Sequence, residues 1–128
     1  MALAFGCKKE IVRQTPIDQA LYGSWTYSAY VDTIYVYAKS TNLVENKLGF
    51  TFNENGTFVE RKINGWCATP PVVLSDYNGS WSIHDSIINI SVGYWGGTVN
   101  YTWRVISLKD NQMKIAIKDI TYHPDNNY

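Results

Sequence analysis

The chain has 128 residues, enough for one domain that buries its own hydrophobic core. Its 11 basic and 11 acidic residues give a formal net charge of zero, which argues against nucleic acid or an anionic membrane surface as a partner. The composition is unusually rich in aromatic residues, with ten tyrosines, five tryptophans and four phenylalanines, and such residues favour β-strands.

Residues 1–19 show no hydrophobic period and are predicted to be a tether. The stretch "LAFGCKKE" places Cys7 after a short apolar run and a small residue, which resembles the end of a bacterial lipoprotein signal. No apolar run approaches the roughly 18 residues of a membrane span, so a lipid on Cys7 is the only membrane contact we expect. A disulfide between Cys7 and Cys67 is the competing use of these two residues, and acylation of Cys7 excludes it.

The first strand is predicted at residues 21–30, after a short helical turn at 17–21. Trp25 and Tyr27 alternate with polar residues and share one face of this strand. Residues 31–46 are open to two interpretations: a strand that ends near Tyr37 and continues as a loop, or one long loop folded over the domain.

Residues 47–63 give the clearest local signal, a hairpin with Asn55-Gly56 in its turn. The incoming strand has three apolar residues on one face: Leu48, Phe50 and Phe52. On the returning strand we expect Phe58 to point inward and Glu60 and Lys62 to lie towards the end of the strand.

The rest of the chain reads as a series of short strands and tight turns. Pro70 and Pro71 exclude a central strand at 64–72, because two backbone donors are missing there. Beyond this loop we expect strands around 81–83, 88–92, 99–105 and 113–118, with turns at 84–86, 93–97 and 109–112. The total of seven to nine alternating strands predicts an all-β, antiparallel up-and-down meander that closes into a barrel.

The triplet Gly-Ser-Trp occurs twice, at 23–25 and 79–81, and we interpret both copies as strand starts. A Gly-x-Trp at the start of the first strand, followed by an antiparallel meander, resembles the lipocalin superfamily. The stretches "LYGSWTYS", "GFTFNENGTF" and "YTWRVISLKDNQMKI", together with the cysteine tether, are similar more narrowly to lipocalin-like domains of small bacterial lipoproteins.

The resemblance implies a lipocalin-like barrel at 20–122, between the tether at 1–19 and a frayed tail at 123–128. Residues 31–46 would then be the large loop over the open end of the barrel. Four residues receive structural roles at the barrel ends: Gly23, Trp25, Gly79 and Trp81. The implied location is the bacterial cell envelope, with the protein lipid-anchored at the outer membrane and facing either the periplasm or the cell surface.

The main functional hypothesis is a non-enzymatic binding module that holds a small apolar molecule inside the barrel. The inward residues expected to line that site are Phe50, Phe58, Tyr101 and Trp103. The two histidines lie in a turn and in the tail, and no metal-ligand spacing or phosphate-binding loop is present, so we expect no catalysis, metal or cofactor.

The alternative hypothesis is a surface module for a glycan or protein of the cell envelope, with a solid barrel core. Its binding residues would be the aromatic residues of two glycine- and proline-containing loops, namely Trp66, Tyr94 and Trp95. In either case we expect a monomer that does not bind nucleic acid.

Overall fold

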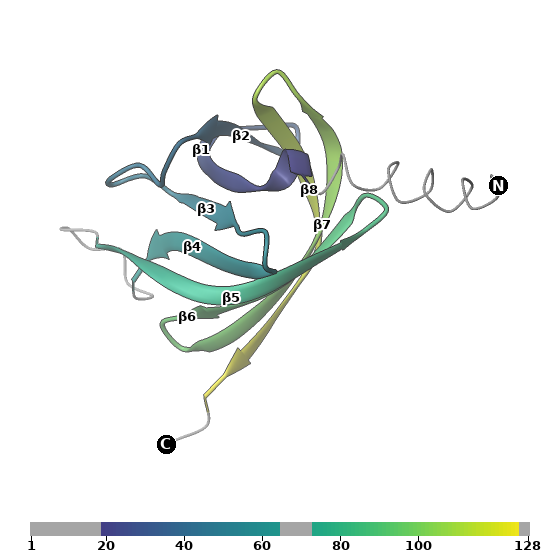
Figure 1. Ribbon diagram of the computed structural model, residues 1–128. Helices are drawn as coiled ribbons and strands as arrows, with labels where there is room; N and C mark the ends of the chain where they lie inside the picture. The colour runs from purple at the N-terminus through teal and green to yellow at the C-terminus, as the bar shows by residue number, and fades with distance from the viewer. Residues whose placement is uncertain (1–18, 65–72, 126–128) are drawn as a thin grey trace, which may run out of the picture.

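The computed structural model describes residues 19–64 and 73–125. Eight strands make up most of this part of the chain (Figure 1). They are β1 (Gly23–Val31), β2 (Ile34–Ser40), β3 (Gly49–Phe52), β4 (Thr57–Ile63), β5 (Leu74–His84), β6 (Ile87–Tyr94), β7 (Gly97–Lys109) and β8 (Gln112–Pro124). All pairings are antiparallel and the sheet closes on itself, which confirms the predicted all-β barrel.

The order of strands round the barrel is β1-β2-β8-β7-β6-β5-β4-β3. From β3 to β8 the strands follow the predicted meander. The one departure is that β1 lies between β2 and β3, so that β2 rather than β1 pairs with β8. The connection 41–48 therefore crosses β1, and it is held there by a hydrogen bond of 2.9 Å from Tyr27 N to Leu48 O.

The two ends of the barrel differ. At one end lie the β3–β4, β5–β6 and β7–β8 turns together with a helical turn at 19–21. We call this the closed end, because Leu21 and Trp25 are fully buried across it. The β1–β2 and β6–β7 turns and the last residues of β8 mark the opposite, open end.

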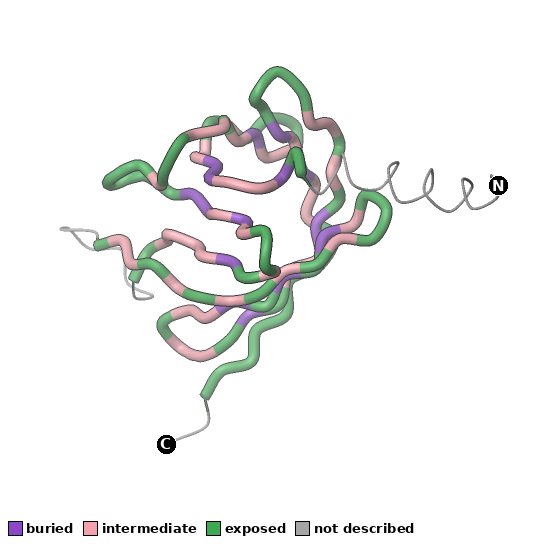
Figure 2. The backbone as a smooth tube through the Cα atoms, in the orientation of Figure 1, coloured by how far each residue is buried: buried purple, intermediate pink, exposed green. Residues whose placement is uncertain are grey.

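Along strands such as β6, buried residues alternate with exposed ones, and the buried residues make up the core (Figure 2). Its buried aromatic members are Trp25, Phe50, Phe52, Phe58 and Trp103, joined by aliphatic residues from β6, β7 and β8. Figure 2 shows these buried positions ringing the barrel, whereas the end of β8 is exposed along its whole length.

Three sequence predictions about element boundaries were wrong. Of the two interpretations of residues 31–46, the single long loop over the open end is wrong and the strand followed by a loop is close, because Ile34–Ser40 forms β2 and closes the barrel against β8. Leu48 precedes β3 and is 40% exposed instead of sharing the inward face of Phe50. The chain does not fray at 123, because His123 and Pro124 still pair with β7.

The second Gly-Ser-Trp is also not a strand start. It lies in the middle of β5, which begins at Leu74. A Cβ atom at Gly79 would lie 2.1 Å from the carbonyl oxygen of Ser91, so the glycine permits close approach of β5 and β6. Gly23, by contrast, does begin β1, with a positive φ of 112° that favours glycine.

Candidate functional site

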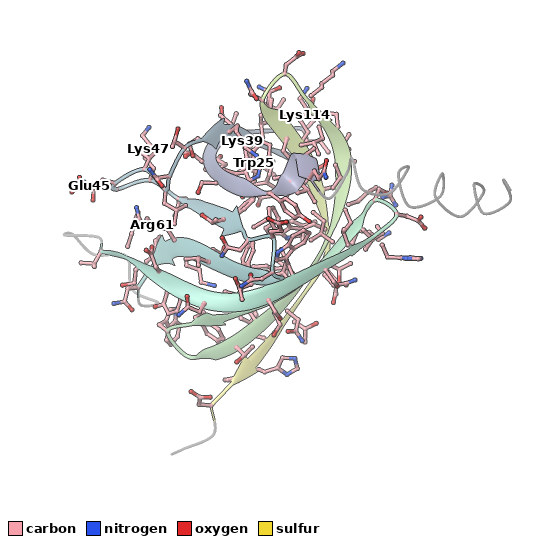
Figure 3. The ribbon with its side chains drawn as sticks, viewed as in Figure 1. Trp25, Lys39, Glu45, Lys47, Arg61 and Lys114 are labelled. Atoms are coloured by element: carbon pink, nitrogen blue, oxygen red, sulfur yellow. The ribbon has the colours of Figure 1, made fainter. Side chains whose placement is uncertain are left out.

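The closed end is sealed by contacts around Trp25. Its indole N–H donates to the carbonyl oxygen of Leu21 at 2.9 Å, which ties the helical turn to β1. The Lys39 ammonium lies 4.6 Å from the centre of the indole ring and donates to the carbonyl oxygen of Tyr22 (Figure 3). This arrangement blocks access from the closed end, so a ligand would have to enter from the opposite one.

The four residues predicted to line a ligand site all face the interior, but they pack against one another. Ring centres of Phe50 and Phe58 are 5.7 Å apart, and those of Phe50 and Trp103 are 5.1 Å apart. Tyr101 stacks on Trp103 at 5.3 Å with an interplanar angle of 18°. These rings fill the closed half of the barrel and form the floor of its open half.

Above this floor lies a charged pair that we call the interior pair, Glu60 and Lys62. The two carry side chains to the same inward face of β4, since they are two residues apart. Lys62 Nζ lies 2.8 Å from Glu60 Oε1, and the Tyr101 hydroxyl donates to the same oxygen at 2.9 Å. Both side chains keep 16% of their surface exposed, so solvent reaches them through the open end.

Burial governs the ionisation of this site. It raises the pKa of Glu60 above its usual value, although Lys62 and the Tyr101 hydrogen bond act in the opposite direction. Burial, with the nearby Glu60 carboxylate, also raises the pKa of both Tyr37 and Tyr101. The two phenols are therefore neutral at physiological pH, and the Tyr101 hydroxyl keeps the hydrogen that it donates to Glu60.

Tyrosines lie next to the interior pair, in contrast to the phenylalanine and tryptophan rings of the floor. Tyr77 and Tyr101 contact Lys62 or Glu60, and Tyr37 is close enough for Glu60 to raise its pKa. Lys62 Nζ lies 5.2 Å from the ring centre of Tyr77 and 5.6 Å from that of Tyr101. The tyrosine walls beside the interior pair thus carry polar tips, whereas the closed half is packed with apolar rings.

The interior pair was missed at the level of sequence, although the signal was present. The spacing of Phe58, Glu60 and Lys62 places all three on one face of a strand, and Phe58 was correctly expected to point inward. Charged residues usually face water, so Glu60 and Lys62 were not placed on the inward face together with Phe58. The pairing of Glu60 with Tyr101, 41 residues away, depends on the register of the barrel.

Of the three loop residues of the alternative hypothesis, the structure brings Tyr94 and Trp95 together. Trp66 lies outside the described residues. Trp95 is 49% exposed in the β6–β7 turn, and its ring meets that of Tyr94 edge to face at 5.5 Å. The ring centres of Tyr94 and Tyr122 of β8 are 5.2 Å apart. Tyr94, Trp95 and Tyr122 therefore form an aromatic group at the rim of the open end.

The remaining predicted structural residues pack at the closed half. Trp81 contacts Phe52 at 4.8 Å between ring centres, and its indole N–H donates to the carbonyl oxygen of Asn53. His84 is the last residue of β5 and Asp85 follows it in the β5–β6 turn, and both are largely exposed. Within 19–64 and 73–125, no three His, Cys, Asp or Glu side chains converge on a possible metal position, and no helix is long and apolar enough to cross a membrane.

The protein is a small closed antiparallel β-barrel of eight strands, packed with aromatic rings towards one end and carrying a charged pair inside the other half. A family model for the lipocalin-like domain matches residues 21–115. The chain therefore belongs to the lipocalin-like domain family, whose members are generally non-enzymatic binding proteins. Neither the curated proteins nor the solved structures include a match to the chain.

Proposed function

We propose that the protein is a non-enzymatic binding module that takes a small, largely apolar molecule into the open half of its barrel. The observation that carries this proposal is the interior pair, Glu60 and Lys62, which faces inward yet stays accessible from the open end. A charged pair in an apolar interior gives little net stability, because desolvation offsets its attraction. A role in recognition accounts for its position better than a role in folding.

The chemistry of the pair selects the polar group of the ligand. Glu60 accepts hydrogen bonds and Lys62 donates them, and together they carry no net charge. A free carboxylate on the ligand would be repelled by Glu60, and an amine would be repelled by Lys62. The preferred ligand is therefore a neutral molecule with one group that both donates and accepts, such as an amide, and an apolar or aromatic body that packs against the tyrosine walls.

The experiment is a titration of the isotope-labelled chain, followed by amide NMR, with matched long-chain ligands that differ only in a carboxamide or a carboxylate group. We expect the carboxamide to shift resonances of β4 and β7 near Glu60 and Tyr101. Lys62→Met should weaken binding at least tenfold, the equivalent of about 1.4 kcal/mol. Arg61→Met is the matched control, because Arg61 lies one residue away on the outer face and pairs there with Asp76. Equal binding by both variants would refute the proposal.

The location of this module is part of the proposal. Acylation of Cys7 would anchor the barrel at the bacterial envelope, and Cys7 lies outside the described residues. The test is expression in a Gram-negative host behind a complete lipoprotein leader. The wild-type chain should fractionate with membranes, and Cys7→Ser should appear in the soluble fraction. Membrane association of the Cys7→Ser chain would argue against the anchor.

A second candidate function rests on the exposure of Trp95. A ring that is 49% exposed at the rim offers a stacking surface for a glycan or an envelope protein. In the same NMR experiment an oligosaccharide pool should then shift residues of the β6–β7 turn, and Trp95→Ala should abolish those shifts without unfolding the barrel. Oligosaccharide shifts that survive in Trp95→Ala would rule out this site.

A further inference from the structure

β8 has an unpaired edge along the second half of its length. β2 pairs with β8 only from Gln112 to Ile115, whereas β7 continues to pair with it as far as Pro124. No described strand lies on the other side of β8 beyond Ile115. Figure 1 shows this part of β8 running out towards the C-terminus, beyond the β1–β2 hairpin.

The unpaired edge is fully open to solvent. Every residue from Lys118 to Pro124 is exposed, as the colouring of Figure 2 shows. In an antiparallel pair, alternate residues direct their N–H and C=O groups towards the partner strand and away from it. Half of the backbone groups of this segment therefore point away from β7 and are available to another strand.

The side chains along the edge are complementary to a second copy of themselves. An antiparallel pairing centred on Thr121 would place Asp119 opposite His123 of the other copy, a carboxylate facing an imidazole. It would also place Ile120 opposite Tyr122, and these two residues are 40% and 58% exposed in one chain. Lys118 would meet Pro124, which ends the strand because it has no N–H to donate.

We infer that two copies of the chain associate through this edge, β8 against β8, about a two-fold axis at Thr121. The interface would be isologous, since the same segment serves both partners. It begins at Lys118, three residues past the last pairing of β2. The inference is independent of the interior pair, and it replaces the sequence-based expectation of a monomer.

The two-fold axis supplies a test that depends on the register. Thr121 would lie opposite itself, so Thr121→Lys and Thr121→Glu would each place like charges together, which destabilises a strand pair. Mixing the two variants would place lysine opposite glutamate. We expect the wild-type chain to approach twice the monomer mass in sedimentation as it is concentrated to the millimolar range. Each variant alone should remain monomeric, and their equimolar mixture should dimerise again.

The matched control is the corresponding pair of substitutions at Ser82, an exposed residue of β5 that pairs with Asn89 of β6 and is separated from β8 by β6 and β7. Ser82→Lys and Ser82→Glu should each dimerise like the wild-type chain. Circular dichroism checks that every variant keeps its barrel. A wild-type chain that stays monomeric at millimolar concentration, Thr121 variants that still dimerise, or a mixture no better than either variant alone would overturn the inference. The inference would also be overturned if a peptide from a different protein paired with this edge of β8.

Discussion

Lys62 and Glu60 form a contact of 2.8 Å inside the barrel although they lie two residues apart on the same strand. Side chains spaced in this way share one face of a strand, so the contact follows directly from the inward position of Phe58. The pair is held between the aromatic floor and the tyrosine walls, with 16% of each side chain exposed. Its net contribution to stability is small, because both ions lose water on burial.

The first prediction concerns the stability of variants at this pair. Lys62→Met leaves the Glu60 carboxylate without its cation, so we expect the free energy of unfolding to fall by about 2–3 kcal/mol. This loss is smaller than for a fully buried ion pair, because solvent reaches the Glu60 carboxylate. The double variant Glu60→Gln/Lys62→Met should be as stable as the wild type, or more stable by about 1–3 kcal/mol. Urea unfolding at pH 7 measures both values. A double variant less stable than Lys62→Met would contradict this account.

The second prediction concerns the seal at the closed end. Trp25→Ala removes a fully buried ring, its hydrogen bond to Leu21 and its contact with Lys39, and we expect a loss of about 3–5 kcal/mol in unfolding free energy. Trp95→Ala is the matched control, because it removes the same side chain from a half-exposed position and should cost about 1 kcal/mol or less. Thermal or urea unfolding distinguishes the two. Similar losses in both variants would mean that Trp95 is a core residue.

The third prediction concerns Gly79. A methyl group there would lie 2.1 Å from Ser91 O and 2.6 Å from Val92 Cα, both backbone atoms that move only if β5 and β6 separate. We expect Gly79→Ala to destabilise the protein by about 3 kcal/mol or more. Gly93 lies on β6 beside Val92, the residue that pairs with Gly79, but the atom nearest to a methyl group there is 3.6 Å away, so Gly93→Ala should change stability by less than about 1 kcal/mol. If Gly79→Ala is tolerated equally well, the two strands are not as close as described.

The barrel itself was largely predictable because its signals are local. Alternation of apolar and polar residues fixes strands such as β6 and β7, and Asn55-Gly56 fixes the turn between β3 and β4. The placement of β1 between β2 and β3 has no such signal. It depends on which edges meet when the sheet closes, and this is decided by packing between residues distant in the chain, as between Trp25 and Phe50.

The candidate site was predictable only in part, for the same physical reason. The inward rings of Phe50, Phe58 and Trp103 follow from alternation, but whether they line a space or fill one depends on contacts across the barrel. The polar chemistry at Glu60 depends on Tyr101 reaching it from β7. The free edge of β8 was missed because the length of a strand gives no information on the length of its neighbour.

The last prediction concerns stability at alkaline pH. Burial raises the pKa of Tyr37 and of Tyr101 above the ordinary value of about 10, and Glu60 raises both further. In the unfolded chain these phenols ionise near pH 10 while the folded protein keeps them protonated. Stability from this source is therefore complete below that pH and is lost as the pH rises through it, by up to about 1.4 kcal/mol per pH unit for each phenol.

Tyr37→Phe tests this argument most directly, because the Tyr37 hydroxyl has no hydrogen-bond partner among the described residues. The variant should match the wild type at pH 7 and lose stability less steeply above pH 10. Tyr101→Phe should show the same shallower alkaline dependence. Its free energy of unfolding at pH 7 should already be lower than that of the wild type, because the variant lacks a hydrogen bond to Glu60 worth about 1–3 kcal/mol. Urea unfolding between pH 7 and pH 11 records both curves. An alkaline dependence of Tyr37→Phe that coincides with the wild type would show that the phenol is not shielded by the barrel.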